Sequence, residues 1–262
     1  MAKICQLFSG SKGNSTFIGG SHGGILIDAG VSAKRLTQRL QELQIDPTCL
    51  QGIFLTHEHN DHVSGVRVFA SKYHIPVFGT QGTMVALEQQ GQLTEKFDAY
   101  ILDQPALSLG EFTVNRFSTS HDTADSCGYR VELADGTRFG VCTDLGFVSQ
   151  EVQRSLTGCH GVVLESNHDL TMLKTGPYPT HLKERVAGRR GHLSNDACAE
   201  LLPTLVQGGT TRIVLAHLSQ ENNLPLLARR TALGALKAAG MEENKDFILQ
   251  VASVCGGMPL PL

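Results

Sequence analysis

The sequence predicts an α/β protein built from layered, mixed β-sheets. Two observations indicate it. Short apolar runs alternate with amphipathic helical patterns in the first and last parts of the chain, whereas residues 99–142 alternate with the period of a β-strand. The 262 residues suffice for one large domain or two small ones. Since no repeat, low-complexity tract or linker marks a boundary, we expect a single domain over 1–262.

The first part of the chain predicts strands near residues 4–8, 15–19 and 24–28, followed by a helix over 32–43. Gly30 and Ser32 suit the turn and the helix cap between them. A strand over 52–56 runs directly into a histidine-rich segment, and a helical pattern continues from Val63 to Ala70. The histidines are therefore expected on a loop between a strand and a helix.

The middle of the chain contains a predicted hairpin, in which an Asp135-Gly136 turn joins residues 129–133 to 138–142. The last part alternates again. We expect strands over 161–164, 211–216 and 247–251, and helices over 178–187, 194–206 and 224–239.

Composition limits the compartment and the partners. The formal charge of −3 excludes a globally basic coat, but a local basic patch remains compatible with nucleic acid. No apolar stretch is long enough to span a bilayer or to form a signal-peptide core. The seven cysteines are an odd number without a C-x-x-C pair, a poor pattern for a disulfide framework. We therefore expect a cytoplasmic protein with reduced, mostly buried thiols.

The strongest motif is H-x-H-x-D-H at residues 57–62. Imidazole and carboxylate groups are the ligands that hold zinc, manganese or iron(II). An extended turn lets His57 and His59 point the same way, while Asp61 and His62 face a second position. A solvated histidine-rich loop is the alternative interpretation.

Three further candidate ligands each follow a predicted strand. His121, Asp144 and His217 stand after the strands that end near residues 117, 142 and 216. Ligands collect at the carboxyl ends of strands in open α/β sheets, so these residues are expected beside the histidine-rich loop. Taken singly, each would be an ordinary core or surface residue.

The segment from Thr56 to Gly65, preceded by Leu26-Ile-Asp-Ala-Gly30, resembles the signature of the metallo-β-lactamase superfamily. His121, Asp144 and Leu215-Ala-His-Leu218 match its later motifs in order. The resemblance implies a four-layer αββα sandwich with mixed sheets.

The resemblance also implies two divalent cations. It places His57, His59 and His121 on one, and Asp61, His62 and His217 on the other, with Asp144 bridging them. Asp28 would support the histidine-rich loop without binding metal. A bridging hydroxide would be the nucleophile, because metals lower the pKa of a bound water toward about 7. Asp61 therefore counts among the catalytic residues as well.

Two further motifs bear on the reaction. Glu165 ends a predicted strand, and His192 precedes a predicted helix. Both resemble the Glu and His motifs by which ribonucleases of the superfamily place a general acid. We expect His192 to protonate the leaving group and Glu165 to orient it. The alternative is that His192 only caps the helix and that Glu165 is a surface charge.

Two segments offer substrate contacts. The Gly-rich turn after the first strand carries Ser9, Ser11 and Asn14 and suits a phosphate, although a surface turn has the same composition. Residues 181–190 carry cations for a polyanion, although a solvated helix face has the same pattern: Lys183, Arg185, Arg189 and Arg190.

Together with E-S-N-H-D at 165–169, G-P-Y-P at 176–179 and G-H-L-S-N at 191–195, the Gly-rich turn resembles the WalJ/YycJ-like subfamily. This resemblance implies a cytoplasmic exonuclease that acts on DNA, more than on RNA, from 5′ ends with Mn²⁺ or Zn²⁺. Iron(II) fits the same donors. Thioester or β-lactam hydrolysis on the same site is an alternative, and a metal-bound sensor or scaffold without turnover is another. Oligomeric state stays open.

Overall fold

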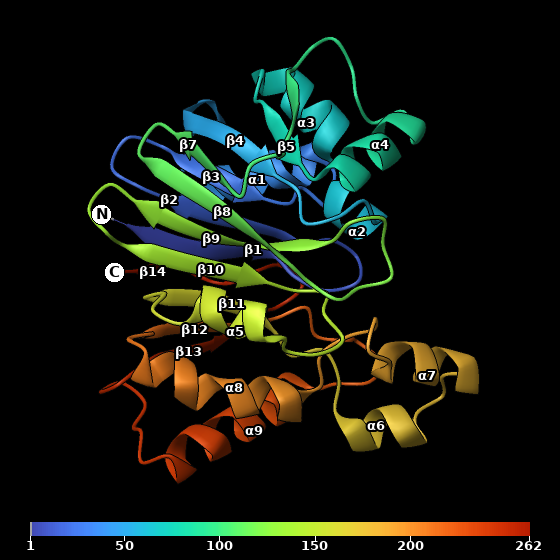
Figure 1. Cartoon of the computed structure of the whole chain (residues 1–262), viewed down its shortest axis with the longest axis vertical. Helices are drawn as coiled ribbons and strands as arrows, with labels where there is room; N and C mark the ends of the chain where they lie inside the picture. Colours follow the sequence, from blue (N-terminus) through green and yellow to red (C-terminus); the bar gives the residue numbers. More distant parts are fainter. Residues whose placement is uncertain (1) are drawn as a thin grey trace.

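Two seven-stranded β-sheets form the centre of the protein (Figure 1). The structure, a computed structural model, describes residues 2–262. The first sheet contains, in spatial order, β14 (Leu260–Pro261), β1 (Lys3–Phe8), β2 (Ser15–Gly19), β3 (Gly24–Ile27), β4 (Leu50–Phe54), β5 (Val77–Gly79) and β6 (Ala99–Ile101). The second contains β13 (Ile248–Val251), β12 (Arg212–Ala216), β11 (Gly161–Glu165), β10 (Arg138–Cys142), β9 (Cys127–Leu133), β8 (Phe112–Ser118) and β7 (Ala106–Leu109).

Each sheet is antiparallel in one half and parallel in the other. In the first sheet the pairs from β14 to β3 are antiparallel, and those from β3 to β6 are parallel. In the second sheet the pairs from β7 to β10 are antiparallel, and those from β10 to β13 are parallel. The predicted mixed sheets are confirmed.

Helices cover the outer faces of the two sheets (Figure 1). Against the first sheet lie α1 (Ala33–Glu42) and α3 (Val66–Tyr73), with the short η1 (Pro47–Cys49), α2 (Asn60–Val63) and α4 (Gln81–Gln89) nearby. Against the second lie α5 (Gln150–Leu156), α8 (Asn195–Gln207) and α9 (Pro225–Ala238). Between β11 and β12 the chain also forms α6 (Leu170–Thr175) and α7 (Thr180–Ala187). Among residues 2–262, no helix combines the length and apolar character that crossing a bilayer requires.

Side-chain alternation along the strands separates three apolar cores. In β3, Ile25 and Ile27 face the core between the two sheets, whereas Leu26 faces the α1 and α3 side. In β11, Val163 faces the inter-sheet core, whereas Leu164 packs toward α5, α8 and α9. Successive strand residues point to opposite faces, so apolar runs in both sheets are buried twice. This arrangement confirms the predicted αββα layers; that the whole chain folds as one domain stays a prediction.

Most predicted elements lie within two residues of their observed bounds. Ser32 caps α1 as expected, with its hydroxyl accepting from Arg35 N. The sequence reading missed β5, α4, α5, α6 and β14. The two missed strands are short: β5 has three residues and β14 has two. Elements of this length carry too few periodic positions to be distinguished from loops.

The prediction that most thiols are buried is confirmed, and their reduced state stays a prediction. All seven cysteines are unpaired within the described residues, and only Cys49 and Cys255 are exposed. Burial raises the pKa of Cys127 and Cys198 to about 12.

We therefore expect only two thiols of the native protein, Cys49 and Cys255, to react rapidly with a colorimetric disulfide reagent at pH 8. The thiolate is the reactive form, and the raised pKa keeps the buried thiols protonated at this pH. The same titration in denaturant should count all seven. Rapid native reaction of most thiols would contradict the structure.

Candidate metal centre

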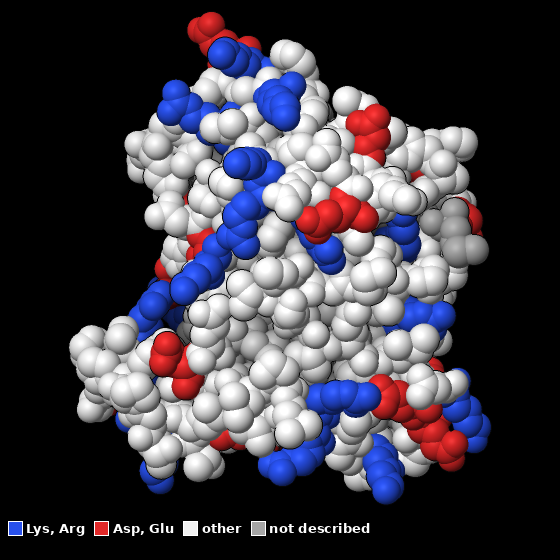
Figure 2. Space-filling view, turned by 180° about the vertical axis from the view of Figure 1, so that it is seen from behind, with Lys and Arg blue, Asp and Glu red and all other residues white. Residues whose placement is uncertain are grey.

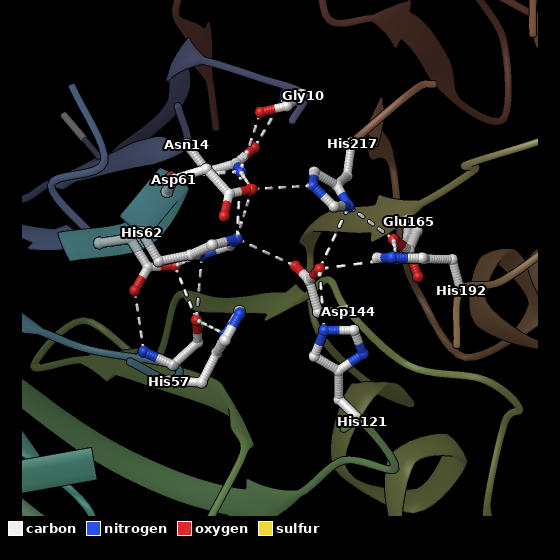
Figure 3. Close-up of polar contacts among 12 residues, drawn as sticks. Gly10, Asn14, His57, Asp61, His62, His121, Asp144, Glu165, His192 and His217 are labelled. Atoms are coloured by element: carbon white, nitrogen blue, oxygen red, sulfur yellow. Dashed lines mark hydrogen bonds and ion pairs between the residues drawn. The ribbon is translucent and has the colours of Figure 1, made fainter. Parts of the chain in front are cut away.

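The candidate ligands stand at one edge of both sheets. His57 and His59 lie on the loop between β4 and α2, and Asp61 and His62 lie in α2 itself. In the second sheet, His121 follows β8, Asp144 follows β10 and His217 follows β12. Figure 3 shows the side chains it labels among these residues lying around Asp144: His57, Asp61, His62, His121 and His217. The carboxyl ends of strands that are far apart in sequence therefore supply the cluster.

The seven predicted ligands form two groups around one carboxylate. Within each group the ligand atoms lie within 4.8 Å of one another: His57, His59 and His121 in one, and Asp61, His62 and His217 in the other. Asp144 lies between them, with Oδ2 3.2 Å from His62 Nε2 and Oδ1 3.7 Å from His121 Nε2. The folded chain thus brings together every ligand that the sequence nominated.

Three of the imidazoles are oriented by acceptors that cannot donate a hydrogen bond. His62 Nδ1 donates to Asp28 Oδ2 at 2.7 Å, His217 Nδ1 to Glu165 Oε1 at 2.7 Å, and His121 Nδ1 to the Gly191 carbonyl at 3.0 Å. A carboxylate or carbonyl only accepts, so each Nδ1 must carry the proton. Each Nε2 is then free to coordinate a cation.

Asp28 occupies the supporting position that the resemblance implied. Its Oδ1 accepts from Thr56 N, and its Oδ2 accepts from Thr56 Oγ1, both at 2.8 Å. His57 Nδ1 lies 3.0 Å from the same hydroxyl, whose proton is directed to Asp28. Thus His57 donates to Thr56, and one carboxylate orients His57 and His62 together.

Unpartnered atoms at the centre of the cluster fit a cation. Within residues 2–262, His57 Nε2, His217 Nε2 and Asp144 Oδ2 are buried without a hydrogen-bond partner. The short distance from His62 Nε2 to Asp144 Oδ2 lacks hydrogen-bond alignment. Leaving buried polar atoms unpaired is costly, and imidazole nitrogen with carboxylate oxygen is the donor set of zinc, manganese and iron. The cluster has the chemistry of a divalent-metal site.

The charges within the cluster support this assignment. Burial raises the pKa of Asp144, but the neighbouring His217 and His62 hold it well below its ordinary value. Burial lowers the pKa of His217, yet Asp144 and its hydrogen-bonded carboxylates raise it to about 10. Burial, with His62, keeps the pKa of His57 well below its ordinary value. The carboxylates are thus ionised, and a bound cation would take over the charge balance that protonated imidazoles otherwise provide.

Glu165 joins the ligand cluster to His192. Its Oε1 accepts from His192 Nδ1 at 2.9 Å and from His217 Nδ1 at 2.7 Å, while its Oε2 accepts from Leu193 N and Leu145 N. Burial raises the pKa of Glu165, but the His192 charge lowers it to about 2. Burial lowers the pKa of His192, and the Glu165 carboxylate raises it above the ordinary value. The contact with His217 was not predicted from the sequence.

A cavity of about 280 Å³ opens over the cluster. It is lined by Ser11, His59, Asp61, His121, Asp144, Asn167, Tyr178, Leu182, Arg185, Val186, His192, His217 and Ser219. A larger cavity of about 440 Å³ lies at the edge strands β6 and β7. Its lining is mainly apolar and includes none of the candidate ligands, so the smaller cavity is the one with the chemistry.

The Gly-rich turn is divided between the cavity and the ligands. Ser11 lines the cavity, whereas Ser9 and Asn14 are buried and do not line it. Ser9 Oγ accepts from His217 N at 2.7 Å. Asn14 Nδ2 lies 3.2 Å from Asp61 Oδ2 and 3.1 Å from His62 Nε2. The structure therefore places Ser9 and Asn14 as supports of the ligands.

Of the four predicted cations, only Arg185 lines the cavity. Its Nε donates to Asp122 Oδ2 at 2.6 Å. Lys183 Nζ donates to a carbonyl of α6, Arg189 lies over the Phe147 ring at 4.3 Å, and Arg190 Nε donates to the carbonyl of His121. These three cations are directed at the protein itself.

The sequence reading also missed part of the cavity wall. Asn167 stands between Glu165 and the start of α6, and its Nδ2 donates to the carbonyl of His217. Tyr178, Leu182 and Val186 recur every fourth residue, a spacing that a test for one helix face would have found.

We expect Asp28→Asn and Glu165→Gln each to weaken zinc binding by about 10- to 100-fold, because an amide cannot replace the carboxylate that orients a ligand imidazole. Competition with a chromogenic chelator measures this affinity, and circular dichroism checks the fold. Glu200, exposed on α8, supplies the control variant Glu200→Gln, which should bind zinc like the parent. Unchanged affinity in both site variants would contradict the assignment.

Comparison with known proteins agrees with this geometry. Residues 24–218 match the family model described as Beta-lactamase superfamily domain. Exodeoxyribonuclease WalJ of Streptococcus pneumoniae (serotype 2, strain D39) is 34% identical over 98% of this chain and 97% of its own length. Exodeoxyribonuclease YycJ of Bacillus anthracis is 33% identical over 92% and 91%.

The solved structure of the metallo-beta-lactamase fold protein YhfI from Bacillus subtilis superposes with a TM-score of 0.72 over 100% of both chains, at 16% identity. That likeness concerns the fold alone. The family model and the two full-length relatives establish more: the chain belongs to the metallo-β-lactamase superfamily and, within it, to the family that includes WalJ and YycJ.

Proposed function

We propose that this protein is a metal-dependent exodeoxyribonuclease that removes nucleotides from 5′ ends of DNA. The proposal rests on the position of His192. Its Nδ1 donates to Glu165, and its ring lines the same cavity as the candidate ligands. The relatives that cover nearly the whole chain are named exodeoxyribonucleases, which supports DNA over RNA. A DNA substrate and unpaired cysteines also fit the cytoplasm as the compartment.

Two divalent cations, zinc or manganese with iron(II) as a further fit, would be held by the two ligand groups and shared by Asp144. When bound, they would stabilise charge on the phosphate and lower the pKa of water toward about 7. Asp61 is the more exposed ligand carboxylate, at 23% against 3% for Asp144. Asp61 also lines the cavity, so we assign it two roles: it coordinates a cation and it orients the attacking water.

His192 is assigned the role of general acid. Its Nδ1 proton is directed at Glu165, so the ring can donate a proton from Nε2 only when it is doubly protonated. The Glu165 carboxylate raises the pKa of His192 and thereby favours this form. As the P–O bond breaks, His192 Nε2 gives its proton to the departing sugar oxygen, which is a poor leaving group without it.

Contacts with the DNA backbone are assigned to Ser11 and Arg185, the two predicted polar contacts that line the cavity. We assign Ser9 and Asn14 to ligand support, and we give Lys183, Arg189 and Arg190 no contact with the scissile phosphate. Thioester or β-lactam hydrolysis would leave the pair of Glu165 and His192 without a task. A sensor without turnover would not need an acid beside its ligands.

The proposal is tested by digesting end-labelled single- and double-stranded DNA and RNA with zinc-, manganese- or iron-loaded protein. We expect stepwise loss of nucleotides from 5′ ends of DNA, with Asp144→Ala as the inactive control. No cleavage of any of the four substrates, together with turnover of a lactam or thioester, would reverse the assignment. Loss of nucleotides from the 3′ end would support the nuclease assignment and contradict the 5′ polarity.

We expect His192→Ala to lower kcat on DNA by about 10²- to 10⁴-fold, the contribution typical of general acid catalysis. The kcat of His192→Ala on a nitrophenyl ester of thymidine 5′-phosphate should fall much less, because nitrophenolate departs without a proton. His181, exposed on α7 and outside the cavity, supplies the matched control His181→Ala, which should retain activity on both substrates. Equal losses of His192→Ala on the two substrates would contradict the acid role.

A further inference from the structure

Helix α7 turns its apolar side chains toward the catalytic cavity. Leu182 and Val186 lie four residues apart within the helix, so they share one face, and Tyr178 lies in the turn just before the helix. All three line the cavity. No residue of α7 is fully buried, which means that this apolar stripe has no core of its own to pack against. The stripe forms one wall of the cavity above the polar cluster.

Tyr178 is presented on a stiff turn. It lies between Pro177 and Pro179, and proline restricts both its own φ and the backbone of the residue before it. Gly176 fixes the start of this turn, since a Cβ there would lie 2.6 Å from Met172 O and 2.9 Å from Asn222 Oδ1. The backbone that carries the aromatic ring is therefore restricted before any ligand arrives, which lowers the entropy cost of binding.

The wall is also tied to the loops that carry the ligands. Arg185 Nε donates to Asp122 Oδ2 at 2.6 Å, directly beside His121. His192 N donates to Val186 O at 2.9 Å. The distance between the apolar wall and the polar cluster is thus set by hydrogen bonds within the protein, and a ligand that spans the cavity needs one apolar and one anionic end.

We propose that the wall formed by Tyr178, Leu182 and Val186 receives the base of the 5′-terminal nucleotide, while the phosphate on its 3′ oxygen, which is the one cleaved, lies at the His/Asp cluster. The inference rests on the proposed nuclease function and names the substrate more closely. The cavity of about 280 Å³ lies near the lower end of the range for small-ligand pockets, about 300 Å³, so it has room for a single nucleotide at most. Aromatic stacking accepts any base, since every base has a π face. The terminal base must therefore leave its pair.

Binding measurements distinguish the contribution of the base from that of the phosphate. Calorimetric titration of the full chain should give a dissociation constant for 2′-deoxyadenosine 3′-phosphate (3′-dAMP) about 5- to 100-fold lower than for 1,2-dideoxyribose 3-phosphate, the sugar phosphate without a base. Tyr178→Ala should erase that ratio, and Tyr178→Phe should keep it because the ring remains. Tyr100, exposed on β6, gives the matched control Tyr100→Ala, which should also keep it.

Kinetics test the same wall on DNA. For the parent protein, the KM for DNA with an abasic terminal nucleotide should be about 5- to 100-fold higher than the KM for intact DNA. For Tyr178→Ala, the two KM values should be equal. A mispaired terminal nucleotide should be removed faster than a paired one, because it is already unstacked. Circular dichroism of each variant checks that the fold is retained.

Several results would overturn the base-binding wall. They are equal affinity of the parent for 3′-dAMP and the sugar phosphate, no binding of 3′-dAMP, or equal weakening of both ligands by Tyr178→Ala. The two proposals fail separately. If the parent cleaves no DNA but retains the ratio that depends on Tyr178, the nuclease assignment fails and the wall stands. If DNA is cleaved without any dependence on the terminal base, only the wall fails.

Discussion

The structure depends on holding buried imidazoles and carboxylates with their lone pairs aimed at one small space. Charge and polarity of this kind are tolerated in a protein interior only when each group is paired or coordinated. Asp28, Glu165 and the Gly191 carbonyl satisfy the outer nitrogen of His62, His217 and His121. The inner nitrogens are thereby left with a cation as their best partner.

Backbone strain accompanies this arrangement. Asp28, Asp144 and His217 each follow a strand and each adopt a left-handed φ, at 63°, 59° and 55°. Non-glycine residues pay about 1–3 kcal/mol for such conformations, which persist only where the surroundings enforce them. Here neighbouring hydrogen bonds do so: Asp28 N donates to Phe54 O, and His217 N donates to Ser9 Oγ. At the common edge of the sheets, this backbone conformation directs the three side chains toward the ligand cluster.

Ligands and substrate wall have different structural origins. The ligands stand at the ends of strands whose positions are fixed by buried sheets, whereas the apolar wall belongs to the segment between β11 and β12 that contains α6 and α7. Within α6 and α7, Leu173 is the only residue that is fully buried. A rigid scaffold can thus keep the metal chemistry constant while this segment determines what fits beside it.

Several features of the protein were determined by the sequence itself. The histidine-rich loop compresses four ligands into six residues, and His121, Asp144 and His217 follow strands with clear periodicity, so local pattern was enough to nominate them. The layered mixed sheets followed from the same periodicities.

Other features required the tertiary structure. Ser9 supports His217 across 208 residues of sequence, Glu165 contacts a ligand as well as His192, and Tyr178 reaches the cavity from outside any recognised ligand motif. Whether a polar residue of a turn or helix faces a cavity, a ligand or solvent depends on which distant segment packs against it. Spacing along the chain carries no record of that packing.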